Sequence, residues 1–220
     1  MVDSIQFRGV FLAAGIIGIA GGVAFAPMKA TGKPLERKHI IIKRKYSNFY
    51  LLQFFSGCRR HIFTTFAVFS LVVIHGLSVK HVTMLLMVNN IVNLYTRTKI
   101  GKLIDQFGEK TILTITYSTL IFAFLGYAYL ENIYFLAGLY CLDHVLFGSN
   151  VALPSYLSKI ADEGDLAPSL AFGSTINHAA AIFIPVLGGT VWDVYGYQAT
   201  FILGAVLLLF SMGFARRIEV

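Results

Sequence analysis

The sequence predicts an all-α, polytopic membrane protein with seven transmembrane helices. Of the 220 residues, 56% are hydrophobic and only 13% are charged, whereas soluble domains carry about a quarter charged residues. The mean hydropathy is +0.71, and the apolar residues fall in long runs separated by short polar gaps. Helices built from such runs are long enough to cross the hydrocarbon core of a bilayer.

The positive charge and the cysteines exclude several other classes of protein. The net charge of +7 is carried at the ends of the apolar runs, where membrane topology requires cations, so we expect no nucleic-acid partner. Cys58 and Cys141 fall on different apolar segments and match no metal-binding spacing, so we expect neither a disulfide nor a bound metal. No nucleophile elbow or phosphate-binding loop is present, and we expect no cofactor and no enzymatic activity.

Residues 1–28 are predicted to form the first transmembrane helix, over about Phe7–Met28. The glycines of this run are tolerated in membrane helices and permit close packing. A cleavable signal peptide is the alternative, because Ala24–Ala26 resembles a cleavage site. A transmembrane helix is favoured because Pro27 would follow the cut and because the cations come after the apolar run rather than before it.

Residues 29–57 are predicted to form a basic cytoplasmic linker. Lys and Arg dominate its first half, and Glu36 is the acidic residue there. The aromatic stretch Tyr46–Phe55 is too short to cross a bilayer alone, so we expect an interfacial helix that lies on the inner leaflet. The alternative is that this stretch forms the start of the next span.

Residues 58–220 are predicted to contain the other six spans and to form a six-helix bundle. Pro154 and Pro185 each remove one helix hydrogen bond and favour a kink. The expected spans cover about residues 58–79, 82–95, 111–130, 133–157, 170–191 and 199–215.

This arrangement of spans fixes an expected orientation. All but two of the 18 Lys and Arg residues fall on one side of the membrane, and the exceptions are Arg8 and Lys80. Loops rich in Lys and Arg stay in the cytoplasm. We therefore expect a multi-pass protein of the plasma (inner) membrane, with the N-terminus outside and the C-terminus in the cytoplasm.

A short polar gap at Arg97–Lys110 is predicted to turn the chain back across the membrane. Gly101 would allow close backbone approach, Gly108 can adopt the positive φ of a tight reversal, and Asp105 can cap a helix. A generic positive cytoplasmic turn would share these features. The order of residues also resembles the G-x-L-x-D-x-x-G-x-[RK] loop of the major facilitator superfamily, through Gly101, Leu103, Asp105, Gly108 and Lys110.

The resemblance implies a place for each helix. In that family the loop recurs after the eighth of twelve helices, so the first span would be the sixth-helix equivalent and the other six would form the C-terminal half bundle. The end of the chain agrees, because Pro185–Gly189, Trp192, Gly196 and Phe201 resemble the family's passage from the eleventh helix to the twelfth.

The resemblance implies the C-terminal half of a secondary active transporter that moves a small solute by alternating access. Such a half offers one wall of a site between two halves, so we expect it to be inactive alone. Its expected partners are the lipid bilayer, a small-molecule substrate that the sequence does not identify, and a separate N-terminal half or a second copy. The alternative is a membrane structural or assembly protein without transport activity.

Polar residues at membrane depth are the candidate site residues, because an ionisable group there is costly and marks function. Asp143, near the middle of the fifth span, is predicted to exchange a proton or hold a cation with His178 of the next span as its partner. Interhelical hydrogen bonding is the alternative role, and it is favoured for the asparagines. The other residues of the expected substrate or proton pathway are His144, Asn177, Asn89, Asn93, Tyr140 and Phe147.

A b-type haem protein is a further alternative. His61 and His75 could lie on one side of a helix at two depths. Each haem would need a second histidine from a neighbouring helix at a matching depth, and the remaining histidines do not repeat this spacing.

Overall fold

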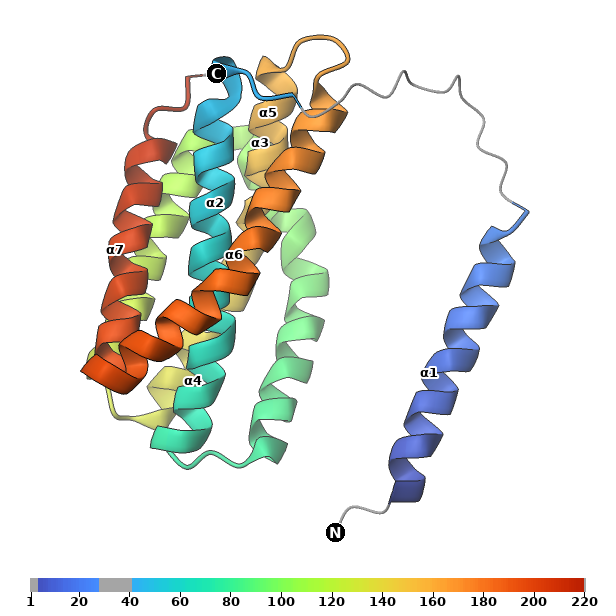
Figure 1. Cartoon of the computed structure of the whole chain (residues 1–220), viewed down its shortest axis with the longest axis vertical. Coiled ribbons are helices and arrows are strands. Elements are labelled where there is room, and N and C mark those ends of the chain that lie inside the picture. The colour runs from blue at the N-terminus through green and yellow to red at the C-terminus, as the bar shows by residue number, and fades with distance from the viewer. Residues whose placement is uncertain (1–3, 28–40, 220) are drawn as a thin grey trace. The chain divides into compact units, whose positions relative to one another are not determined.

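The computed structural model describes residues 4–27 and 41–219, which form helices and short connections with no strand among them (Figure 1). The all-α prediction is therefore confirmed. The chain divides into two compact units, residues 1–37 and residues 38–220, and each is described by itself.

The first unit contains one helix, α1 (Ser4–Phe25). Its 22 residues give a length of about 33 Å, which matches a hydrocarbon core of about 30 Å. Large apolar side chains such as Phe11 and Ile17 are exposed along it, as expected for a helix that faces lipid. Residues 28–40, which hold the first part of the predicted basic linker, lie outside the described residues.

The second unit begins with a long segment that combines three types of helix. The 3₁₀ turn η1 (Arg44–Tyr46) leads into α2 (Ser47–Ile62), which continues through two π-helical turns, η2 (Phe63–Ala67) and η3 (Ser70–Ile74). Together these pieces form one segment of 31 residues that is long and apolar enough to cross a membrane.

This segment begins well before the predicted start at Cys58. The aromatic stretch Tyr46–Phe55 belongs to it and is not a separate interfacial helix. Tyr46, Phe49 and Leu52 are fully buried, because their three-residue spacing places them on one face of the helix, where they pack into the bundle. Of the two interpretations of this stretch, the one that makes it the start of the next span agrees with the structure.

The helix α3 (Val79–Tyr129) contains two spans in one continuous run of 51 residues. Gly108 has φ 78° and ψ 158° and breaks the helix there, and Figure 1 shows the two halves as separate rods. The predicted positive φ at Gly108 is thus confirmed. The predicted loop differs, because Arg97–Phe107 is helical and the chain reverses at the glycine itself.

The remaining helices complete the bundle. One crossing segment of 28 residues consists of α4 (Ile133–Leu146), the 3₁₀ turn η4 (Phe147–Val151) and α5 (Ala152–Ile160). It is followed by α6 (Leu166–Tyr195) and α7 (Tyr197–Ala215). With the break at Gly108 counted, residues 41–219 therefore supply six crossing segments.

A cluster of aromatic rings forms the core of the bundle towards one end. The ring of Phe63 lies 5.2 Å from the rings of Phe124 and Tyr127, and the ring of Tyr127 lies 5.0 Å from that of Phe201. The Tyr127 hydroxyl donates to the carbonyl of Leu136 at 2.9 Å, so the buried phenol is satisfied. These contacts join the η2 turn, the second half of α3, and α7.

Helices α2 and α6 approach each other closely at Gly57. A Cβ atom at this position would lie 2.7 Å from the backbone oxygen of Asn177. Small residues at such crossings are a common feature of membrane helix packing. The crossing also brings the polar residues of α2 and α6 close to each other in the middle of the bundle.

Candidate functional site

A buried ion pair joins α2 to α4. The Nη1 atom of Arg59 lies 2.9 Å from Oδ1 of Asp143, and the two side chains are 1% and 6% exposed. The Nε and Nη2 atoms of Arg59 have no hydrogen-bond partner among the described residues. Asp143 therefore pairs with an arginine and not with His178 as predicted, and Arg59 lies inside the bundle and not at the cytoplasmic boundary.

The neighbours of Asp143 on α4 belong to the same buried region. Tyr140 is 1% exposed, and its ring lies 4.3 Å from the ring of His144. The Nδ1 atom of His144 lies 3.0 Å from the carbonyl oxygen of Tyr140. The sequence suggested that Tyr140 and Asp143 would line a cavity with Phe147, but the structure places Tyr140 in the core and Asp143 in the buried ion pair.

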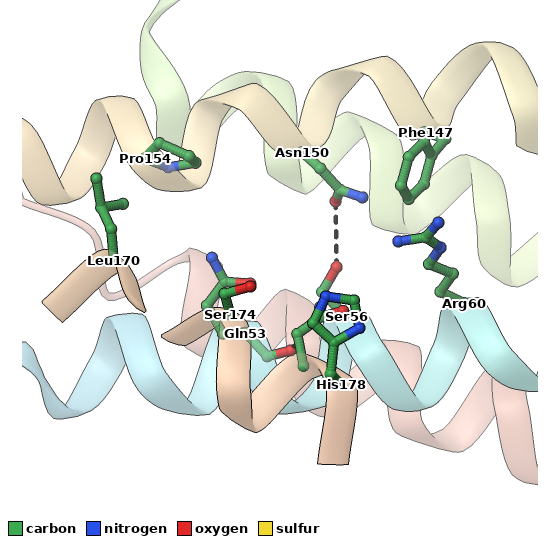
Figure 2. A pocket seen from close by; sticks show the side chains of 10 residues that line it. Gln53, Ser56, Arg60, Phe147, Asn150, Pro154, Leu170, Ser174 and His178 are labelled. Atoms are coloured by element: carbon green, nitrogen blue, oxygen red, sulfur yellow. Dashed lines mark hydrogen bonds between the residues drawn. The ribbon is translucent and has the colours of Figure 1, made fainter. Parts of the chain in front are cut away.

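A polar pocket of about 270 Å³ opens on another side of α2, between α2, the η4–α5 segment and α6 (Figure 2). Three of the predicted site residues, Phe147, Asn177 and His178, line it. The other lining residues were not among the predicted site residues, although Pro154 was expected to kink the fifth span. The full lining is Gln53, Ser56, Arg60, Phe147, Asn150, Pro154, Leu170, Ser174, Asn177 and His178.

Arg60 is the charged residue of this lining. Its guanidinium carbon lies 4.5 Å from the centre of the Phe147 ring, a distance typical of a cation–π contact. Figure 2 shows the guanidinium directed along the pocket towards Asn150. Among the described residues, Arg60 forms no ion pair, in contrast to Arg59 beside it.

Two hydrogen bonds fix the polar walls of the pocket. Ser56 donates to Oδ1 of Asn150 at 3.2 Å, which joins α2 to η4. The Nδ2 atom of Asn177 donates to the carbonyl of Gln53 at 3.1 Å, which joins α6 to α2. The remaining polar groups of these side chains are left to face the pocket, so the site can hold a small polar solute.

Asn89 and Asn93 do not line this pocket. Asn89 is 2% exposed, and neither its amide nitrogen nor its amide oxygen has a partner among the described residues. Asn93 is half-buried, and its amide oxygen likewise has no partner there. They lie one turn apart on the first half of α3, so they face the same side of that helix, as predicted.

The loop motif is built differently from its prediction. Gly101 lies on the helix, and a Cβ atom there would meet nothing within 4 Å, so no close backbone approach exists. Leu103, Asp105 and Lys110 are exposed, and the side chain of Asp105 makes no hydrogen bond to any described residue. The carboxylate that does bind neighbours is Glu109, which the sequence did not single out.

Glu109 anchors the start of the second half of α3 to α5. Its Oε1 atom accepts from the Ser155 hydroxyl at 2.6 Å, and its Oε2 atom accepts from Lys159 at 2.9 Å. The carboxylate is 3% exposed and Lys159 is 47% exposed. The position of Glu109 directly after the helix-breaking Gly108 is the feature of the sequence that could have predicted this contact.

A second charged cluster joins the start of α2 to the α5–α6 connection. Asp162 accepts hydrogen bonds from Lys45 at 2.6 Å and from Lys43 at 3.1 Å, and Lys43 also pairs with Asp165. The buried Tyr46 hydroxyl donates to Asp165 at 3.0 Å and accepts from the amide of Asp162 at 3.0 Å. The bonds from Lys45 and Lys43 lower the pKa of Asp162 to about 2.

The sequence missed Arg59 and Arg60 as site residues for an identifiable reason. Adjacent basic residues at the start of an apolar run are typical of a membrane boundary. The signal that could have corrected this is the aromatic stretch Tyr46–Phe55, because joining it to the next run places both arginines in the middle of one helix.

Comparisons with known proteins agree with this architecture. A model of the Major Facilitator Superfamily matches residues 1–167. The chain is also 29% identical over 114 residues to an uncharacterized MFS-type transporter of Methanocaldococcus jannaschii, and the aligned part is 50% of this chain and 28% of that protein. No solved structure matches the chain. Because the family model covers well over half of the residues, the chain belongs to the Major Facilitator Superfamily.

Proposed function

We propose that this chain acts as the C-terminal half of a secondary active transporter, with its substrate held at the pocket beside Arg60. The observation that carries the proposal is the depth of this polar pocket. Arg60 lies 16 residues from Arg44 and 14 from Ile74, the two ends of its crossing segment. At 1.5 Å per residue, each end of the segment is roughly 20 Å or more from Arg60, so the pocket is near the centre of the bilayer.

The depth of the pocket is informative because polar groups at the centre of a bilayer are costly and mark functional sites. Seven of its ten lining residues carry polar side chains, and His178 and Ser174 are exposed. Secondary transporters hold their substrates near the bilayer midplane, between two helical repeats that rock about the site. The pocket therefore supplies one wall, and a second half of the transporter supplies the other.

The half-transporter interpretation also fits the extent of the resemblance. The aligned region covers 28% of the archaeal relative, so most of that protein has no counterpart in the alignment. We propose that α1 corresponds to the sixth helix of the family and the bundle of residues 41–219 to the seventh through twelfth. On this assignment the chain alone cannot alternate access and is inactive until a second half is present.

The structure changes the roles proposed for the individual residues. His178, Asn177 and Phe147 remain candidates for substrate contact because they line the pocket. Asp143 instead holds Arg59 and so positions α2, which in turn directs Arg60 into the pocket. We place His144, Tyr140, Asn89 and Asn93 in the packing behind the site.

Reconstitution into liposomes tests the proposal. Uptake of a carboxylate, a sugar and an amine is measured with the chain alone and with the chain joined to the part of the archaeal relative that corresponds to the family's first five helices. We expect accumulation of at least one class of solute when both halves are present and none with the chain alone. Uptake by the chain alone would show that it is active by itself, and no uptake by the joined halves would favour the structural or assembly role.

A further inference from the structure

Arg59 and Arg60 are neighbours in sequence with different electrostatic surroundings. Successive helical residues project about 100° apart, so Arg59 points into the bundle and Arg60 points into the pocket. Arg59 is paired with Asp143 at 2.9 Å and is 1% exposed. Arg60 is half-buried against Phe147 and forms no ion pair with any described residue.

The helices that surround the pocket contain no second carboxylate at this depth. Asp143 is the acidic residue near the middle of the crossing segments that line the pocket, and it is already bound to Arg59. Asp162 and Asp165 lie at one end of these segments, and Asp193 lies in the last turn of α6. Among the described residues, the pocket lining thus includes one permanent cation and no anion.

A cation at the centre of a membrane is costly unless a counter-charge or water accompanies it. The Phe147 ring covers one face of the guanidinium at 4.5 Å and provides part of the compensation. The N–H groups at the edge of the guanidinium stay available, and their fork matches a carboxylate in a bidentate arrangement.

Further donors lie beside Arg60. The Oδ1 atom of Asn150 accepts from Ser56 at 3.2 Å, so the Nδ2 group of Asn150 is the part left to donate to a ligand. Figure 2 shows this nitrogen on the side of the amide that faces Phe147 and Arg60. Phe147 and Leu170 provide apolar surface for the body of a ligand.

We propose that the pocket binds a small organic anion, with its carboxylate on Arg60 and Asn150 and its apolar body beside Phe147. This inference rests on the proposed transport function, since it names the class of substrate that the transporter would carry. The counter-charge that Arg60 lacks within the bundle is then supplied by the substrate itself.

The first test measures the electrostatic potential of the pocket. Ser174→Cys is introduced together with Cys58→Ala and Cys141→Ala, and the thiol is treated with anionic and cationic methanethiosulfonate reagents of similar size. We expect the thiol to react faster with the anionic reagent than with the cationic one. Arg60→Gln should reduce the ratio of the anionic to the cationic reaction rate about tenfold. Arg60→Lys should keep most of the ratio, and Arg216→Gln, at the exposed end of α7, should leave it unchanged. Faster reaction of the cationic reagent, or no effect of Arg60→Gln, would overturn the proposal.

The second test uses three ligands of nearly equal shape. Binding of benzoate, benzamide and benzamidine to the purified full chain is measured by equilibrium dialysis. We expect benzoate to bind at least tenfold more tightly than the neutral and cationic analogues, and to slow modification of the cysteine at position 174. Arg60→Gln should remove the preference, and folding is checked by an unchanged melting temperature. Equal binding of all three ligands, or binding of none, would count against an anion site.

The outcomes separate this inference from the transport proposal. If the joined halves accumulate neutral or cationic solutes and never carboxylates, transport stands and the anion site is wrong. If benzoate binds through Arg60 while no solute is ever accumulated, the anion site stands and the transport role is wrong.

Discussion

Arg59 of α2 and Asp143 of α4 form an ion pair within the helix bundle, with 2.9 Å between Nη1 and Oδ1 and almost no exposure of either side chain. Removing both charges from water is costly, and the attraction between them compensates for that cost only while both are present. The pair therefore fixes two crossing segments relative to each other. It also orients the turn of α2 that places Arg60 in the pocket.

Breaking this pair should destabilise the bundle strongly. Asp143→Asn leaves the Arg59 charge buried without a counter-ion, and loss of one partner of a buried pair typically costs about 3–5 kcal/mol. We expect a loss of this size in the free energy of unfolding of the detergent-solubilised chain. Asp193→Asn, at an exposed position of α6, should change it by less than about 0.5 kcal/mol.

The double variant Arg59→Gln/Asp143→Asn completes the comparison. Because it removes both charges, we expect it to be more stable than either single variant. A double-mutant cycle then gives the coupling energy between the two residues. Additive losses would show that the residues act independently and that the pair does not join α2 to α4.

The two glycines of the loop motif should respond in opposite ways to substitution by alanine. Gly108 has φ 78° and ψ 158°, a conformation that residues with a Cβ rarely adopt, so Gly108→Ala should lower stability by about 1–3 kcal/mol. Gly101 is helical with open space around its Cβ position, so Gly101→Ala should raise stability by up to about 1 kcal/mol. Thermal unfolding of the two variants measures the difference, and similar effects of both would contradict the helical placement of Gly101.

The sequence predicted most of the fold because membrane helices are defined by local composition. Long apolar runs predicted the six crossing segments of residues 41–219, and the position of Gly108 predicted the reversal within α3. The start of α2 was missed because Arg59 and Arg60 resemble a membrane boundary. The burial of Arg59 depends on Asp143, which is 84 positions away, and no local pattern reports such a partner.

The candidate site was predicted only in part for the same reason. His178, Asn177 and Phe147 were recognised as polar or aromatic groups at membrane depth, and they line the pocket. Depth alone does not say which side of a helix faces its neighbours, so Asp143 and Tyr140 were assigned to a cavity although they lie in the core. Placing them correctly requires the packing of α2 against both α4 and α6.

The charged cluster at the start of α2 should stabilise the bundle in a defined pH range. Bonds from Lys45 and Lys43 lower the pKa of Asp162 from its usual 3.8 to about 2, so the stabilisation is complete above pH 3.8 and is lost as the pH falls through about 2. Bonds to Asp165 and Asp162 raise the pKa of Lys43 above 10.5. Its contribution is therefore complete below that pH and is lost at higher pH.

Asp162→Asn tests this range. We expect the variant to melt at a lower temperature than the native chain at pH 7 and at the same temperature at about pH 1.5, where the native carboxyl is also neutral. Asp105→Asn is the matched control, because this exposed carboxylate makes no side-chain hydrogen bond to a described residue. A melting difference that persists in acid would show that Asp162 does not act through its charge.

The orientation of the chain in the membrane is open to a direct labelling test at the two ends of one crossing segment. Glu131 and Ser158 are exposed and lie near the two ends of the segment that runs from Ile133 to Ile160. Arg59 and Arg60 lie within the bundle and so do not mark the cytoplasmic side, but Lys159 adjoins Ser158, and Lys43 and Lys45 bind Asp162 at the same end of the segment.

We therefore expect opposite labelling of the two positions in intact cells. With Cys58→Ala and Cys141→Ala as background, Glu131→Cys should react with a membrane-impermeant thiol reagent, because the positive-inside rule places this end outside. Ser158→Cys should react only after the cells are opened, and this second labelling step shows that the thiol itself is accessible. Reaction of Ser158→Cys in intact cells together with protection of Glu131→Cys would reverse the orientation, and it would place the charged cluster of Lys43, Lys45 and Asp162 on the outer side of the membrane.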